Sequence, residues 1–98
     1  MRGPTYDLED IKAKVRVGYY SITLSAGTDA LALGFDERDV VDCVLYVSEF
    51  EFYKTMSSTA KWGFMQDVYR TSYDTIPIYL KLQLDRNSRA VVISFKRL

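Results

Sequence analysis

The chain has 98 residues, of which 48% are hydrophobic and 27% charged, a composition typical of one globular domain covering residues 1–98. Lys plus Arg and Asp plus Glu number 13 each, so binding to nucleic acid would need a local cluster of cations rather than a net positive charge. Without histidine and with a single cysteine, the chain cannot form a Ser-His-Asp or Cys-His catalytic triad, a zinc site of histidine and cysteine, or an internal disulfide.

The apolar stretches are too short for a membrane span. The longest of them are interrupted by Asp42 and Glu49, and the N-terminus has no apolar signal segment. We therefore expect a cytoplasmic protein, in which Cys43 is a small residue of the apolar core.

The first predicted element is an amphipathic helix over Leu8–Val17, with Asp7 as its N-cap and Gly18 as its stop. Its outer side carries three basic residues, a pattern more typical of a solvated helix face than of a ligand site: Lys12, Lys14 and Arg16. The β-branched and aromatic residues of Tyr19–Leu24 then predict a short strand.

Two further helices are predicted before residue 48. Ser25 can cap a helix that ends at Gly34, and Asp36 can cap a third helix over Glu37–Val47, whose aliphatic residues form the main apolar face. After these helices, Ser48 and Glu51 have the spacing of a capping box, which predicts a short helix from Glu49 to Met56 followed by a polar loop over Ser57–Ala60.

In the second half of the chain, apolar residues recur at every second position. Phe64–Tyr73, Ile76–Leu84 and Ala90–Lys96 are predicted strands, and residues 85–88 form the turn between the last two. Helices followed by a meander of strands predict an α+β fold, in which helices pack on one face of a small antiparallel sheet formed largely by the C-terminal half.

Side chains alternate between the two faces of a strand, so the pattern also predicts which residues share a face. Ile76, Ile78, Leu80, Leu82 and Leu84 point to the core, as do Val91, Ile93 and Phe95, while Val92 points away. The opposite face, called the polar face below, collects Gln66, Arg70, Tyr79, Lys81, Ser94 and Lys96. Lysine and arginine can bind phosphate oxygens and tyrosine can stack on bases, although polar residues on a half-solvated sheet also serve solubility alone.

Five short motifs occur in a fixed order along the chain: PTYDL at 4–8, FYKTM at 52–56, QDVY at 66–69, YLK at 79–81 and VISFK at 92–96. Together they closely resemble the MqsR family of toxins from bacterial toxin–antitoxin systems. The resemblance covers nearly the whole chain and is densest from Phe52 onward.

The resemblance implies a compact RelE-like fold and an endoribonuclease that cleaves messenger RNA with a preference for GCU-type sites. A mechanism consistent with the candidate side chains named below needs neither a metal nor another cofactor. The resemblance also implies a cognate antitoxin as partner, through which alone the chain would contact DNA. From the short apolar stretches we expect no membrane partner. The residues associated with activity in the family correspond to Lys54, Gln66, Tyr79 and Lys96, with Lys54 reaching the polar face from the predicted short helix. Arg70 and Lys81 are candidates for binding RNA.

The chain departs from the family pattern where arginines are common, at Ser21 and Leu24, and where a tryptophan is usual, at Met65. The residues after SFK are Arg97 and Leu98 instead of an acidic-basic pair. Fewer cations weaken attraction to RNA, so a non-catalytic or weakly active module that keeps the antitoxin interface is an alternative. A regulatory DNA-binding protein has less support, because no helix-turn-helix with a basic recognition helix is predicted.

Overall fold

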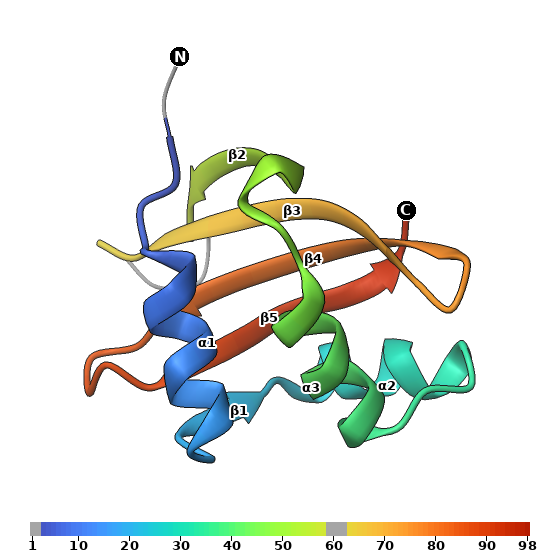
Figure 1. The fold of residues 1–98 in the computed structure, drawn as a ribbon. Helices are drawn as coiled ribbons and strands as arrows, with labels where there is room; N and C mark the ends of the chain where they lie inside the picture. The colour runs from blue at the N-terminus through green and yellow to red at the C-terminus, as the bar shows by residue number, and fades with distance from the viewer. Residues whose placement is uncertain (1–2, 59–62) are drawn as a thin grey trace.

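The computed structural model describes residues 3–58 and 63–98, and within them it forms an α+β fold with a mixed five-stranded sheet (Figure 1). The sheet order is β1-β5-β4-β3-β2, in which β1 runs parallel to β5 and the other neighbouring pairs are antiparallel. In chain order the elements are α1 (Leu8–Arg16), β1 (Tyr20–Ile22), α2 (Leu24–Ala32), α3 (Glu37–Tyr46), the 3-10 turn η1 (Glu49–Glu51), β2 (Phe52–Ser57), β3 (Met65–Tyr73), β4 (Ile76–Leu84) and β5 (Ala90–Arg97). The predicted fold class is confirmed, with the addition of the parallel strand β1.

Most predicted elements are found within two residues of their expected bounds. The N-caps Asp7 and Asp36 are confirmed, since the Asp7 side chain accepts from the Glu9 N–H and the Asp36 side chain from the Asp39 N–H. Gly18 ends α1 as expected, with a positive φ of 81° that allows the Tyr19 N–H to reach the Lys14 carbonyl.

The prediction for the start of α2 was wrong by two residues. Thr23, rather than Ser25, is the N-cap, and its hydroxyl oxygen accepts from the Ala26 N–H. The Thr23 hydroxyl also donates to the Ile93 carbonyl at 2.9 Å. This bond to β5 depends on the tertiary structure, which local sequence does not reveal.

The predicted helix over Glu49–Met56 was also wrong. The capping box of Ser48 and Glu51 exists, but it holds a single 3-10 turn, and the chain then enters β2 at Phe52. Ser57 belongs to that strand, while positions 59 and 60 of the predicted loop lie outside the described residues. Pairing with β3 along the sheet edge supplies the hydrogen bonds that override the local helical pattern.

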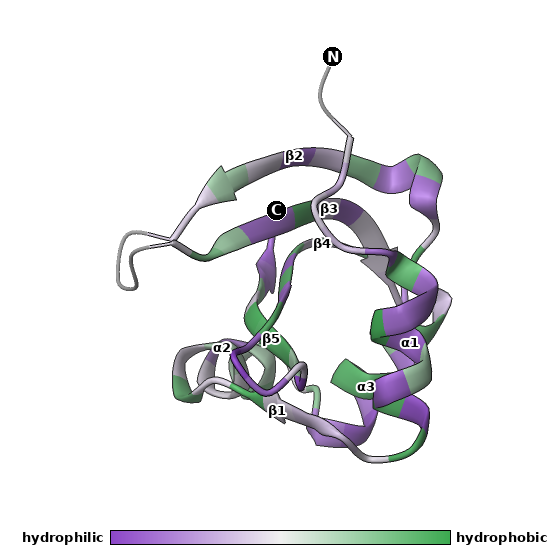
Figure 2. Cartoon of the chain, turned by 90° about the vertical axis from the view of Figure 1, so that its left-hand side faces the viewer, coloured by the Kyte–Doolittle hydropathy of each residue, from purple (hydrophilic) through white to green (hydrophobic). Residues whose placement is uncertain are grey.

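The helices α1 and α3 lie on the same side of the sheet (Figure 1), and the view turned by 90° shows them again on one side (Figure 2). Between helices and sheet lies one apolar core, whose largest fully buried side chains include Tyr69, Phe95, Ile11, Ile78 and Leu80. Cys43 belongs to this core as predicted, and burial raises the pKa of its thiol to about 12. None of the helices in residues 3–58 and 63–98 has the length and apolar character needed to cross a membrane.

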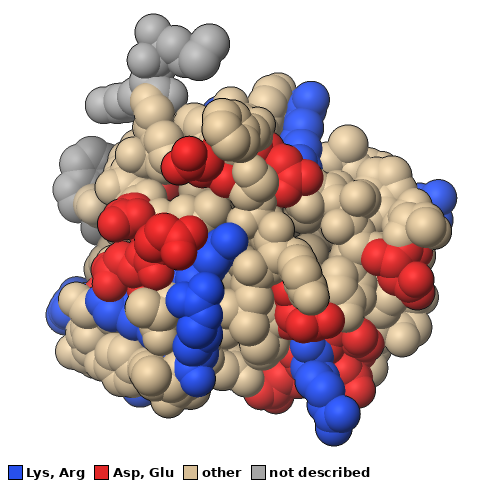
Figure 3. Space-filling model, in the orientation of Figure 1, with Lys and Arg blue, Asp and Glu red and all other residues tan. Residues whose placement is uncertain are grey.

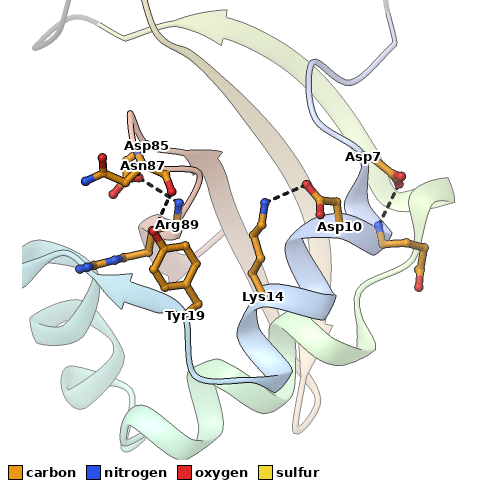
Figure 4. Close-up of polar contacts among 8 residues, drawn as sticks. Asp7, Asp10, Lys14, Tyr19, Asp85, Asn87 and Arg89 are labelled. Atoms are coloured by element: carbon orange, nitrogen blue, oxygen red, sulfur yellow. Dashed lines mark hydrogen bonds and ion pairs between the residues drawn. The ribbon is translucent and has the colours of Figure 1, made fainter.

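Polar contacts hold the loops at the β1 end of the molecule (Figure 4). The Tyr19 hydroxyl donates to the Asn87 carbonyl at 2.7 Å, and Asp85 accepts from the Asn87 and Arg89 N–H groups. The last two bonds close the predicted turn between β4 and β5. That turn sets the register in which the polar side chains of the two strands meet.

Candidate nucleic-acid interface

The six side chains predicted for the polar face do lie on the same side of the sheet, opposite α1 and α3. Arg70 is directly across from Tyr79 on the neighbouring strand, and Tyr79 is directly across from Lys96. Lys81 is paired in the same way with Ser94, and the Gln66 amide donates to Gln83. Strands β3, β4 and β5 therefore bring together residues up to 30 positions apart in sequence.

A β-bulge at Ile93 makes this arrangement possible. Lys81 pairs with Ser94 and Leu82 pairs with Val92, so Ile93 is an extra residue in β5. The prediction that Val91 and Ile93 point to the core and Val92 away from it was wrong. Val92 is buried in the core with Phe95, whereas Val91 pairs with Gln83 beside the polar face. The bulge changes the alternation after Val92, which returns Ser94 to the polar face.

Lys54 reaches the polar face from β2 and not from a short helix. It pairs with Val68 of β3, which in turn pairs with Lys81 of β4. A second bulge lies just before it, because Phe52 pairs with Tyr69 while Lys54 pairs with the adjacent Val68. Phe52 packs edge-on against Tyr69 on the core side, at 5.7 Å between ring centroids. Without the bulge, alternation would turn Lys54 to the same side as Phe52.

The polar face concentrates positive charge in a chain whose formal net charge is +0. Four cations lie on it, and within the described residues none of the four takes part in an ion pair: Lys54, Arg70, Lys81 and Lys96. The one acidic residue of β3, Asp67, is paired with Leu82 and fully buried on the core side. The face thus offers cations whose charge is not neutralised by neighbouring carboxylates.

The opposite surface has a different charge pattern. Figure 3 shows acidic and basic side chains side by side over the helices. On α1, Lys14 bonds to Asp10 at 3.2 Å and Lys12 lies 3.9 Å from Glu9. Lys12 and Lys14 are thus partly neutralised within the same helix. Arg16 is exposed, as expected for a solvated helix face, but Lys12 is only 8% exposed, so the prediction that it lies on that face was wrong.

Each cation of the polar face lies near a tyrosine ring. Tyr79 has the Lys96 ammonium 5.2 Å and the Lys81 ammonium 5.7 Å from its ring centroid. Tyr53 of β2 has the Arg70 guanidinium carbon at 3.6 Å and the Lys54 ammonium at 5.5 Å. Tyr53 was not among the predicted site residues, although it directly precedes Lys54 in the FYK motif. Its proximity to Arg70 depends on strand pairing, which the motif does not contain.

Gln66 lies in a more enclosed part of the face. Only 8% of its surface is exposed, and its side-chain amide N–H donates to the Gln83 carbonyl oxygen at 3.1 Å. Gln83 is itself 6% exposed. The pair orients both amides, so Gln66 has less freedom to move than the exposed cations Lys54, Arg70 and Lys96.

Metal ligands are scarce around this surface. Within residues 3–58 and 63–98, no group of three or more His, Cys, Asp or Glu side chains is arranged to hold a metal ion. The groups that the described part of the face offers for chemistry are ammonium, guanidinium, amide, hydroxyl and phenol groups. Such groups can bind a phosphate, stabilise charge that develops on it, and move a proton.

Residues 3–97 match the model of a protein family described as motility quorum-sensing regulator, toxin of MqsA. The chain is also 33% identical over 95 residues to the mRNA interferase toxin MqsR of Escherichia coli strain K12. That alignment covers 97% of this chain and 95% of the E. coli protein. Both matches extend over the helices as well as the strands that carry the polar face.

Proposed function

The chain belongs to the MqsR toxin family, and on this premise we propose that it is an endoribonuclease that cleaves messenger RNA on the polar face of its sheet. The observation that carries the proposal is the set of four cations that share the polar face with Tyr79, without an ion pair in the described part of the chain. An RNA phosphate is a natural partner for such a surface, since it supplies the negative charge that the face lacks.

The proposed reaction is attack of the ribose 2′-hydroxyl on the adjacent phosphorus. The O2′–P bond forms while the P–O5′ bond breaks, which gives a 2′,3′-cyclic phosphate and a free 5′-hydroxyl. One proton leaves the 2′-oxygen and one reaches the 5′-oxygen. DNA lacks the attacking hydroxyl and would not be cleaved.

The roles follow from the chemistry of each side chain. Lys54 and Lys96 would stabilise the charge that develops on the phosphate oxygens, and Tyr79, between Arg70 and Lys96, would carry a proton. Arg70 and Lys81 would bind RNA beside the reacting phosphate. Gln66 would orient a neighbouring group through its amide, since the hydrogen bond to Gln83 holds that amide in place.

We further propose that the preferred sites are of GCU type, that no metal is required, and that a cognate antitoxin of the MqsA type neutralises the activity. The test is incubation of the purified chain with a GCU-containing RNA in the presence of EDTA. The expected product carries a cyclic phosphate, and replacing the reacting 2′-hydroxyl with hydrogen should abolish cleavage at that site. Addition of the antitoxin should stop the reaction.

Replacement of Tyr79 by phenylalanine tests the central residue. If Tyr79 transfers a proton, Tyr79→Phe should lower kcat by about 10²- to 10⁴-fold, because general acid–base help contributes on that order. A matched control is Tyr46→Phe, since Tyr46 is 78% exposed at the end of α3. A rate for Tyr79→Phe close to that of the unsubstituted chain, with cleavage lost only in Lys54→Ala and Lys96→Ala, would exclude this role.

The alternative is a module that kept the fold and the antitoxin interface while cleavage was lost. Ser21 favours it, because it lies on β1 across from Val91, beside the polar face, where relatives commonly carry arginine. Leu24, the other such position, is 87% exposed at the start of α2 and adds no charge. Antitoxin binding without any cyclic-phosphate product would favour this second function.

A further inference from the structure

Tyr53 and Arg70 form the closest cation–ring contact in the described part of the chain. The guanidinium carbon lies 3.6 Å from the ring centroid, whereas the other such distances are between 5.2 and 5.7 Å. At 3.6 Å the guanidinium lies against the ring, close to van der Waals contact. The contact joins the edge strand β2 to the neighbouring strand β3.

A bulge in the backbone of β2 allows Tyr53 to make this contact. The bulge between Phe52 and Lys54 adds one residue to the edge strand, so that both Tyr53 and Lys54 lie on the polar side while Phe52 stays in the core. Bulges re-aim side chains in this way at sheet edges and next to active sites. Tyr53 remains 47% exposed, so burial in the core does not explain its place.

The stacked guanidinium keeps its donors free. With the guanidinium carbon only 3.6 Å from the centroid, there is no room for an N–H group to point at the ring, so the ring lies against the face of the guanidinium and the donors lie in its plane. Within the described residues, Arg70 has no carboxylate partner that would occupy these donors. The backbone of Arg70 is directly across from Tyr79 of β4, and its guanidinium lies over Tyr53 of β2 on the same face, so the donors belong to the polar face. A planar group held in one orientation suits bidentate binding of a phosphate.

We propose that Tyr53 is a positioning residue of the RNA site, which holds the Arg70 guanidinium on the polar face ready to bind an RNA phosphate. The proposal rests on the proposed function of the polar face. A free arginine side chain loses rotamer entropy when it binds a ligand. The stack on Tyr53 restricts Arg70 before RNA arrives, so that less entropy is lost in the complex.

The test compares four substitutions by their dissociation constants for an RNA that carries a 2′-deoxyribose at the cleavage site. Tyr53→Leu should weaken binding about fivefold to tenfold, which is the size of a partly desolvated cation–π contact. Tyr53→Phe keeps the ring and should bind within about twofold of the unsubstituted chain. Arg70→Lys keeps the charge but not the planar donors, and should bind nearly as weakly as Arg70→Ala.

A double-mutant cycle distinguishes positioning from direct contact. If Tyr53 acts through Arg70, Tyr53→Leu should have almost no further effect in the Arg70→Ala background. The matched control is Tyr46→Leu, which removes an exposed tyrosine on the helix side and should not change RNA binding. Urea denaturation should give the same free energy of unfolding for Tyr53→Leu and Tyr53→Phe.

Two results would overturn the proposal. One is an equal loss of binding from Tyr53→Leu with and without Arg70, which would mean that the ring contacts RNA by itself. The other is a loss from Tyr53→Phe as large as that from Tyr53→Leu. Because the RNA cannot be cleaved, the cycle reports on Tyr53 even if the chain proves to have no nuclease activity; absence of RNA binding by the unsubstituted chain would overturn both proposals.

Discussion

At the scale of single residues, Tyr69 combines complete burial with an unused polar group. Its ring packs in the core and is 0% exposed, and its hydroxyl is without a hydrogen-bond partner in the described part of the chain. Burial of the phenol, together with the nearby charge of Asp67, raises the pKa of Tyr69 to about 12. An unpaired buried hydroxyl costs free energy, since its hydration is lost and nothing replaces it.

Tyr69→Phe should therefore leave the free energy of unfolding at pH 7 unchanged or raise it by about 1 kcal/mol. The raised pKa means that the folded state holds its proton more tightly than the unfolded state, whose tyrosine titrates near pH 10. This contribution to stability is fully present below pH 10 and is lost as the pH rises towards 12. The free energy of unfolding, measured by urea denaturation, should fall less between pH 9 and pH 11.5 for Tyr69→Phe than for the unsubstituted chain. A decrease of more than about 1 kcal/mol at pH 7 would mean that the hydroxyl has a partner.

At the scale of elements, a buried carboxylate joins the N-terminal segment to β3. Asp67 is 0% exposed and accepts the N–H groups of Thr5 and Tyr6, both at 2.9 Å. The Tyr6 hydroxyl donates to the Met65 carbonyl at 2.7 Å. Two of the family motifs, PTYDL and QDVY, thus meet in space, and the aspartate of the second motif has a structural role on the core side of the strand.

Replacement of Asp67 tests this role. Asp67→Asn replaces one acceptor oxygen with an NH₂ group that cannot accept, and should lower the free energy of unfolding by about 3 kcal/mol. Backbone hydrogen exchange at Thr5 and Tyr6 should accelerate in the same variant. Asp29→Asn, on the exposed side of α2, is the matched control and should change neither quantity. A loss below about 1 kcal/mol would contradict this structural role of Asp67.

At the scale of the whole molecule, the two surfaces differ in charge although the chain is neutral in sum. Within the described residues the polar face carries four cations outside ion pairs, whereas Lys12 and Lys14 of α1 lie beside acids of the same helix. Figure 3 shows this mixture of acidic and basic side chains on the helix side. RNA binding should therefore depend on salt as it does for a basic protein. Four phosphate contacts predict that log K falls with log salt at a slope of about −3 for single-stranded RNA.

The effect of a lysine substitution on the salt dependence of RNA binding should depend on which surface carries that lysine. Lys81→Ala should reduce the steepness of the salt slope by about 0.7, because one phosphate contact is lost. Lys14→Ala should leave it unchanged, because this lysine bonds to Asp10 on the helix side. Fluorescence anisotropy of labelled RNA from 50 to 300 mM salt, roughly the range over which such slopes are measured, gives both values. Equal slopes for the two variants would show that RNA does not bind to the polar face.

The sequence by itself determined the helices α1 and α3, the strand β4 and the composition of the polar face. These features depend on short-range rules, namely capping residues such as Asp7 and Asp36 and the alternation of Ile78, Leu80 and Leu82. The motifs supplied the family, which the comparisons confirmed. Lys54 was named from a motif alone, but the element that carries it was predicted wrongly.

The tertiary structure alone decided the two bulges, the strand that carries Lys54, and the contact of Tyr53 with Arg70. A bulge has no local sequence signature here, because it arises from a mismatch in register between two strands that are distant in sequence. It fixes which of two faces every following side chain joins, as Val92 and Ser94 show on β5. Most of the residues that share the polar face could therefore be predicted from the sequence, whereas their geometry depends on strand pairing across the sheet.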